Sequence, residues 1–181
     1  MANDKMQPRL ILVLTLITIA SAVSLTFIDD LTAPLIAEEA EKRVQEAVLS
    51  VVPDAVDFEE VEDENFEIFK ALDEVGEVVG VAVQHDIRGY TGPIDVMVGL
   101  DMAEEKIIAL DVLSHTETPG LGARITEDEF RDQFRGRDFS SQEEVDIIAG
   151  ATISSNAVEV VVSEVVESAE DIQAAVESGG E

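Results

Sequence analysis

The chain has 181 residues, enough for one membrane segment and one globular domain but too few for two enzymatic domains. Its 40 acidic and 11 basic residues give a formal net charge of −29, which argues against nucleic acid as a partner, because phosphate binding needs clustered Lys and Arg side chains. The absence of cysteine excludes disulfides, thiolate iron–sulfur clusters, Cys-ligated zinc sites and a lipid-modified N-terminal cysteine.

The first predicted element is a transmembrane helix over residues 10–28, which contain no charged side chain. At about 1.5 Å per residue this helix is roughly 28 Å long, close to the roughly 30 Å of a bilayer's hydrocarbon core. A cleaved signal peptide is the alternative, because residues 20–22, Ala-Ser-Ala, resemble a cleavage site. Cleavage there would leave a new N-terminus that is still apolar, which favours an uncleaved anchor.

The charges around this helix predict its orientation. Lys5 and Arg9 precede it, whereas the next basic residue is Lys42, so residues 1–9 are predicted to be cytoplasmic. Residues 29–181 would then form an extracytoplasmic domain, held at the cytoplasmic (inner) membrane by a single span.

Within the outer domain, the first predicted element is a second helix. It begins at residues 32–34, Thr-Ala-Pro, where a polar cap is followed by an early proline, and it ends before Pro53. Residues 54–65 are strongly acidic, which predicts an exposed connection. One apolar stripe of this helix predicts core packing, and its members are Leu35, Ile36, Ala40, Val44, Ala47, Val48 and Val51.

Four short apolar runs then predict an antiparallel sheet of four or more strands. They pair around two turn-rich interruptions, residues 73–76 and 101–105. Helical signals follow at residues 127–134 and after Ser155, where apolar residues keep a helical spacing up to Ile172 although many are β-branched. The fold class is therefore predicted to be α+β. The predicted strands cover residues 66–72, 78–84, 94–100 and 107–113.

Two loops are rich in small residues, and each lies directly beside a predicted strand or helix. Residues 115–122, HTETPGLG, follow a strand, and their glycines allow backbone N–H groups to approach a ligand, although an ordinary turn is the alternative. Residues 146–152, DIIAGAT, precede the last helix, whose N-terminus would suit a phosphate; the alternative is an ordinary helix start capped by Thr152 or Ser155. The two histidines lack the spacing of a local metal motif, so no metal site is predicted. If this protein moves electrons, the carrier is expected to be organic.

Together the two loops resemble those of the FMN-binding domain family, which includes the G subunit of the Rnf electron-transport complex and the C subunit of sodium-translocating NADH:quinone oxidoreductase. The resemblance covers nearly the whole chain, including the single N-terminal span. It is specific because ETPGLG, residues 117–122, precedes a D-x-x-x-G-A-T motif at residues 146–152. Further matching segments are TAP at residues 32–34, GEVVGVAV at 76–83, GYTGPIDVMVGLD at 89–101 and SHTETPGLGARI at 114–125.

This resemblance implies that Thr152 accepts FMN through a phosphoester bond made by a separate flavin transferase. A separate enzyme is chemically reasonable, because a threonine hydroxyl is a poor nucleophile without an activating base. The chain departs from the family at Ala149, where Ser or Thr is usual, and Ser154 is a second, less favoured acceptor. The motif for the transferase would be Asp146, Gly150, Ala151 and Thr152.

The resemblance also implies a cradle for the flavin. Gly150 and Ala151 would contact the cofactor near its point of attachment, and Leu121 would lie against the ring. One wall of the cradle would come from Glu117, Thr118, Pro119, Gly120, Leu121 and Gly122.

The family finally implies an electron-transfer subunit of a membrane-bound, Rnf-type ion-translocating ferredoxin:NAD oxidoreductase, not catalytic by itself. Its partners would be the other membrane subunits and the flavin transferase. Three alternatives stay open: the C-type subunit of the sodium-translocating quinone reductase, a stand-alone extracytoplasmic flavoprotein, and a non-redox, membrane-tethered acidic binding module.

Overall fold

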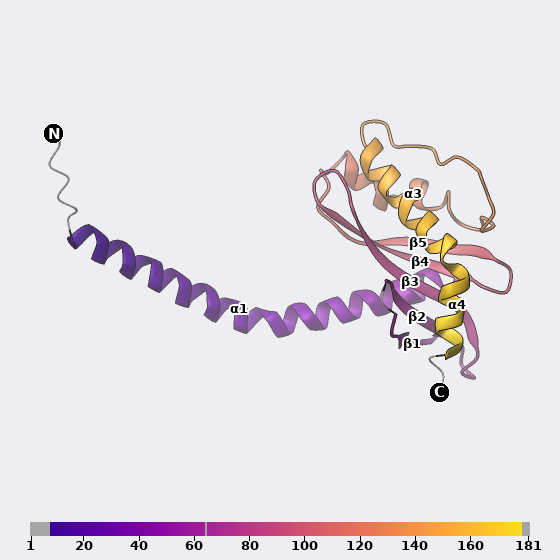
Figure 1. Cartoon of the computed structure of the whole chain (residues 1–181), viewed down its shortest axis with the longest axis horizontal. Coiled ribbons are helices and arrows are strands. Elements are labelled where there is room, and N and C mark those ends of the chain that lie inside the picture. The colour runs from indigo at the N-terminus through magenta and orange to yellow at the C-terminus, as the bar shows by residue number, and fades with distance from the viewer. Residues whose placement is uncertain (1–7, 64, 179–181) are drawn as a thin grey trace. The chain divides into compact units, whose positions relative to one another are not determined.

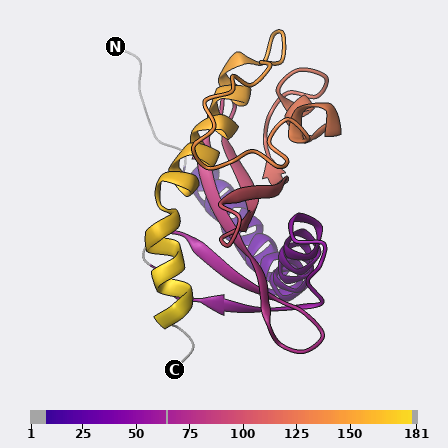
Figure 2. The same cartoon turned by 90° about the vertical axis from the view of Figure 1, so that its right-hand side faces the viewer.

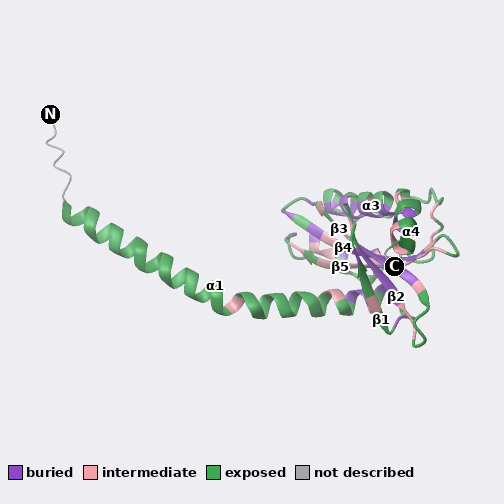
Figure 3. Cartoon of the chain, turned by 60° about the horizontal axis from the view of Figure 1, so that its bottom comes forward, coloured by how far each residue is buried: buried purple, intermediate pink, exposed green. Residues whose placement is uncertain are grey.

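The computed structural model describes residues 8–63 and 65–178, and the chain divides into two compact units between Lys42 and Arg43. The described residues of the first unit belong to one helix, α1 (Pro8–Val51), which continues into the second unit. Figure 3 shows the long exposed part of α1, and among the described residues it is the one helix long and apolar enough to cross a membrane. These properties suit a single-pass membrane anchor. Most of the predicted cytoplasmic segment, residues 1–9, lies outside the described residues.

Helix α1 is continuous, so the helix start predicted at residues 32–34 is wrong. Pro34 lies inside the helix. The Thr32 hydroxyl does not cap a new helix but donates to the Ile28 carbonyl oxygen, one turn earlier, at 3.0 Å. This back-bonding satisfies the hydroxyl within a helix. The carbonyl that Pro34 cannot bond belongs to Asp30, which is exposed, so no buried polar group is left without a partner there.

The second unit is built on a five-stranded antiparallel sheet in which each strand pairs with the next along the chain, in the order β1-β2-β3-β4-β5 (Figure 1). This confirms the predicted antiparallel sheet and the α+β class. The prediction of a connection over residues 54–65 is wrong for residues 57–61, which form one edge strand of the sheet. Its acidic side chains face solvent while Val61 is buried, so its sequence resembles that of an exposed loop. The strands are β1 (Asp57–Val61), β2 (Glu67–Leu72), β3 (Val78–Arg88), β4 (Pro93–Asp101) and β5 (Lys106–His115).

Each face of the sheet has its own hydrophobic core, because side chains alternate between the faces along every strand. In β4, Val96 and Val98 belong to one core, and Met97 between them belongs to the other. Figure 2 shows the sheet between the C-terminal helices on one side and the end of α1 on the other. The central strands are therefore apolar on both faces, which explains their continuous apolar sequences.

The last turns of α1, from residue 43 onward, cover one face of the sheet. Val48 and Val51 are fully buried there, which confirms this end of the predicted apolar stripe. The stripe is wrong further back, where Leu35 and Ile36 are 64% and 65% exposed. The helix approaches the sheet so closely that a Cβ on Gly99 would clash with the Val51 carbonyl oxygen.

Helices α3 (Thr152–Glu167) and α4 (Ala169–Ser178) cover the opposite face. The prediction of one helix beginning after Ser155 is wrong at both ends. Helix α3 already begins at Thr152, and the chain leaves it at Ser168 before α4 starts. Between β5 and α3 lie the short helices η1 (Gly122–Thr126) and α2 (Asp128–Arg131), so the helix predicted over residues 127–134 is shorter than expected.

Candidate functional site

The two loops selected from the sequence lie next to each other in the fold. Residues 115–122 leave β5, and residues 146–152 lead into α3. They are joined by the Ser154 hydroxyl, in the first turn of α3, which donates to Oε2 of Glu117 at 2.6 Å. A third segment, the turn between β3 and β4, joins them because the Thr91 N–H donates to Oε1 of Glu117 at 2.9 Å.

Glu117 is the buried centre of this arrangement, with 5% of its surface exposed. Burial by itself raises the pKa of the Glu117 carboxyl. Hydrogen bonds from the Ser154 hydroxyl and from the backbone of residues 90–92 outweigh this effect, so the pKa lies below its ordinary value of 4.5. Both carboxylate oxygens are therefore occupied by donors of the chain itself, and the charged side chain ties three segments together.

The geometry of the site explains why glycine occupies positions 122 and 150. A Cβ on Gly122 would lie 2.5 Å from Oε2 of Glu117, so any other residue would displace the carboxylate. Gly150 has a φ of +84°, in a turn closed by the Ala151 N–H donating to the Ile148 carbonyl oxygen at 2.9 Å. Residues other than glycine rarely adopt this conformation.

The loops and the start of α3 surround a cavity of about 360 Å³. Three apolar side chains on its lining are unusually exposed: Tyr90 by 71%, Leu121 by 49% and Ile153 by 54%. Exposed apolar side chains gathered around one hollow are typical of a binding site. The residues that line the cavity are Tyr90, Glu117, Thr118, Leu121, Gly122, Gly150, Ala151, Thr152, Ile153 and Ser154.

Thr152 is exposed at this cavity as the first residue of α3. The residue before it, Ala151, occupies the N-cap position, and no side chain of the described residues makes a cap hydrogen bond there. Ser155, a predicted alternative cap, instead accepts the N–H of Ile148 at 3.2 Å. The first N–H groups of a 16-residue helix are thus left without a capping side chain, at the positive end of the helix dipole. Such a helix start suits an anion such as a phosphate.

Most of the residues predicted to bind a cofactor line this cavity, and their contact with a cofactor stays a prediction. Pro119 and Gly120 belong to the same loop but are not among the lining residues. Tyr90 and Ile153 line the cavity without having been predicted, although Tyr90 lies in the GYTG segment and Ile153 directly follows the second motif. Ser154, predicted only as a less favoured acceptor, lines it as well. The predicted residues brought together are Glu117, Thr118, Leu121, Gly122, Gly150, Ala151 and Thr152.

Asp146 and Ala149 do not line this cavity. With Ile147 and Ile148 they form one side of a neighbouring groove of about 250 Å³, whose other side comes from η1 and α2. The motif of residues 146–152 therefore runs past two hollows, the groove at its beginning and the cavity at its end.

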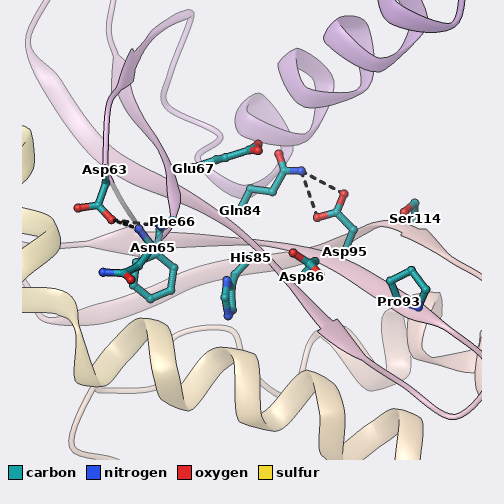
Figure 4. A pocket seen from close by; sticks show the side chains of 10 residues that line it. All are labelled: Asp63, Asn65, Phe66, Glu67, Gln84, His85, Asp86, Pro93, Asp95 and Ser114. Atoms are coloured by element: carbon teal, nitrogen blue, oxygen red, sulfur yellow. Dashed lines mark hydrogen bonds between the residues drawn. The ribbon is translucent and has the colours of Figure 1, made fainter.

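A larger cavity of about 550 Å³ lies over the sheet and is rich in carboxylates (Figure 4). The Gln84 side-chain amide donates to both oxygens of Asp95, at 3.1 and 3.0 Å. Burial raises the pKa of Asp95, the Gln84 hydrogen bond partly offsets this, and the charges of Glu67 and Asp86 raise it again. A phosphate-bearing ligand would be repelled here. Among the described residues, no group of three or more His, Asp or Glu side chains is arranged to hold a metal ion.

Comparison with known proteins shows matches to one family. The family model of the FMN-binding domain matches residues 89–167, which include both loops. The G subunit of an ion-translocating oxidoreductase complex from Methanosarcina acetivorans is 38% identical over 128 residues, which are 63% of this chain and 68% of that protein. The G subunit of a proton-translocating ferredoxin:NAD(+) oxidoreductase complex from Clostridium ljungdahlii is 29% identical over 179 residues, 92% of this chain and 95% of that protein.

A solved structure shows the same fold. It is that of the Na(+)-translocating NADH-quinone reductase C subunit from Parabacteroides distasonis, with a TM-score of 0.57 over 75% of this chain and 92% of that chain. The two sequences are 19% identical, so this likeness concerns the fold alone.

Proposed function

This chain belongs to the FMN-binding domain family represented by the G subunits of ion-translocating oxidoreductase complexes, and from this premise we propose that it carries electrons through an FMN esterified to Thr152. The observation that carries the proposal is the position of Thr152. It is an exposed residue with a hydroxyl, at the uncapped start of α3, beside a cavity with exposed apolar side chains.

The cavity suits the two chemically different parts of FMN. Tyr90, Leu121 and Ile153 offer an apolar surface to the flat isoalloxazine ring. The start of α3 offers backbone N–H groups and the positive end of a dipole to the phosphate. The two loops lie close together at Gly150, where a Cβ would come within van der Waals contact, 3.4 Å, of Cδ2 of Leu121.

A covalent bond would hold the FMN phosphate at a site whose described lining residues include no cationic side chain to bind it. Neither Lys nor Arg is among the described residues that line the cavity, and the whole chain carries a formal charge of −29. Free FMN would therefore bind here with only the helix dipole to offset its phosphate charge, an effect worth about 0.3–1 kcal/mol at exposed sites. A phosphoester to Thr152 holds the cofactor without a cation and also removes one of its negative charges.

The attachment is a phosphoryl-type transfer without any redox change. The bond from Thr152 Oγ1 to the FMN phosphorus forms, and the phosphoanhydride bond of an activated FMN donor breaks. The phosphate-bearing part of the donor leaves, and the hydroxyl proton passes to a base of the transferase. Ser154 is poorly placed as an acceptor, because it is 1% exposed and already donates its hydroxyl proton to Glu117.

Bound FMN would supply reversible one- and two-electron transfer, and the residues that line the cavity would hold it beside the start of α3. We propose a role as a subunit of a membrane complex of the type named for the Clostridium ljungdahlii relative, a ferredoxin:NAD(+) oxidoreductase coupled to ion translocation. In that complex the other membrane subunits would be the electron donor and acceptor. This chain would not be catalytic alone.

The decisive experiment compares the chain expressed with and without a flavin transferase. After denaturation and digestion, the peptide that contains Thr152 is expected to gain the mass of one FMN phosphoester only when the transferase is present. When the chain is purified in mild detergent from the membranes of its own host, other members of the complex are expected to co-purify. Flavin that is wholly released by denaturation would contradict the covalent assignment.

We also propose that α1 anchors the chain in the cytoplasmic membrane, with the second unit on the outer side. The support is the basic Arg9 directly before the apolar run, whereas the next basic residue after the run is Lys42. A C-terminal fusion to a phosphatase that is active only outside the cytoplasm is expected to be active and to remain with the membrane fraction. An inactive fusion, with activity restored when the reporter is moved to the N-terminus, would reverse the orientation.

A further inference from the structure

The segment before the attachment site has no helix or strand of its own. Residues 141–148 are irregular, so their backbone polar groups cannot be satisfied by a ladder of neighbouring strands. At Asp146, both backbone polar groups are instead bonded by the side chain of Gln133, which lies in the turn after α2. Its Oε1 accepts the Asp146 N–H at 2.7 Å, and its Nε2 donates to the Asp146 carbonyl oxygen at 3.3 Å.

The beginning of this segment is held by Arg137. Its Nη1 donates to the Glu143 carbonyl oxygen at 2.7 Å and its Nη2 to the Glu144 carbonyl oxygen at 3.4 Å. Its Nε donates to the backbone carbonyl oxygen of Gln133 at 2.5 Å, so the Arg137 side chain also fixes the backbone that carries Gln133. The side chains of Gln133 and Arg137 are together called the clamp. The backbone is thus fixed by side chains from one short region, residues 133–137.

The end of the segment is held from inside the domain. The Ile148 N–H donates to Oγ of Ser155, which is fully buried, and the side chains of Val145 and Ile148 are buried in the core. By contrast, Asp146 and its neighbour Ile147 are exposed. The backbone is therefore anchored while the side chains that begin the motif remain accessible along the groove.

We propose that Gln133 is a positioning residue for flavinylation, which holds residues 146–152 in the conformation that the transferase binds. This inference rests on the proposed function. A segment that is already ordered avoids the entropy cost of ordering on binding, so removing the clamp weakens recognition more than it slows the chemical step. Gln133 itself contacts neither Thr152 nor the flavin cavity.

The test uses the full chain in detergent, purified transferase and a flavin dinucleotide as the phosphoanhydride donor. Initial rates of in-gel flavin fluorescence are measured over a range of chain concentrations. Gln133→Ala is expected to raise KM by about tenfold with little change in kcat, because only the ordering of the segment is lost. Gln133→Glu keeps an oxygen for the Asp146 N–H but turns a carboxylate oxygen toward the Asp146 carbonyl oxygen, so it is expected to recover only part of this loss.

The matched control is Gln173→Ala, on α4, where the side-chain amide donates to Oε1 of Glu177 at 3.1 Å on the exposed surface. Its KM is expected to equal that of the unmodified sequence. Hydrogen exchange supplies a readout independent of flavin, in which the Asp146 amide is expected to exchange faster in Gln133→Ala while core amides of β4 are unchanged.

The possible failures are distinct. A Gln133→Ala chain with unchanged KM overturns the positioning role, and an Asp146 amide that exchanges equally fast in both chains shows that the clamp does not order the segment. If the unmodified chain itself gains no covalent flavin, the proposed function fails and the inference fails with it.

Discussion

Replacing Thr152 with Ala is expected to abolish the flavin fluorescence that stays with the chain after denaturation. The substitution removes the exposed hydroxyl at the start of α3 beside the cavity and leaves the helix intact, because alanine is a good helix former. Thr152→Ser restores a hydroxyl at the same position and is expected to retain the fluorescent band. The measurement is in-gel fluorescence under ultraviolet light, normalised to protein, from membranes expressed with the transferase.

Two control variants separate attachment from damage to the cavity. Thr118→Ala removes the other threonine that lines the cavity and is expected to keep the band. Ser154→Ala removes a buried hydroxyl that donates a hydrogen bond to Glu117. In a variant chain that folds, the fluorescent band is expected to persist. An equally bright band from Thr152→Ala would move the attachment site elsewhere in the chain.

Replacing Glu117 with Gln is expected to lower the free energy of unfolding of the second unit by about 1–3 kcal/mol near neutral pH. The carboxylate accepts hydrogen bonds from the Ser154 hydroxyl and the Thr91 N–H, and the pKa shift also reflects bonds from Tyr90 and Gly92. An amide of the same size keeps one acceptor oxygen but turns an NH2 group toward donors. The loss can be measured by pulse proteolysis in urea, with the exposed Glu127→Gln as the control, whose ion pair with Arg124 is a surface pair.

The loss at Glu117 should depend on pH in a defined direction. Because the pKa of Glu117 is lower in the folded chain than its ordinary value of 4.5, its stabilising effect is fully present above that value. The effect is lost as the pH falls from 4.5 through the lower pKa of the folded state. The difference between the unmodified chain and Glu117→Gln is therefore expected to shrink over this range. A difference independent of pH would show that the charge of Glu117 does not contribute.

Several features were predictable because their causes are local in the sequence. The strands β2 to β5 follow from short apolar runs bounded by turn residues, and the apolar run of residues 10–28 forms a continuous helix. The acidic edge strand β1 was missed, because a strand at the edge buries little and so carries a weak apolar signal. The helix start predicted at residues 32–34 was wrong because the preference of proline for the first turn of a helix is only a tendency. Pro34 lies inside α1, and the Thr32 hydroxyl bonds within that helix.

The candidate acceptor could also be recognised from the sequence. Thr152 and the residues around it form a contiguous motif, and the other loop, residues 115–122, is contiguous as well, so a family resemblance could assign both without knowing their positions in space. Glycine at position 150 has a local cause, because the turn there requires a positive φ. The sequence did not indicate that the helix begins at Thr152 itself, because β-branched residues around that position weaken the helical signal.

The sequence by itself determined the composition, the apolar span, the sheet and the two motifs, because each is encoded by residues close together along the chain. Only the tertiary structure decided that Glu117 is a buried tie between three segments, that Tyr90 joins the cavity, and that Gln133 holds Asp146. These contacts join residues far apart in sequence, and their partners are backbone groups or hydroxyls that any residue pattern could offer. Their selection depends on how the sheet and α3 pack, which no local pattern specifies.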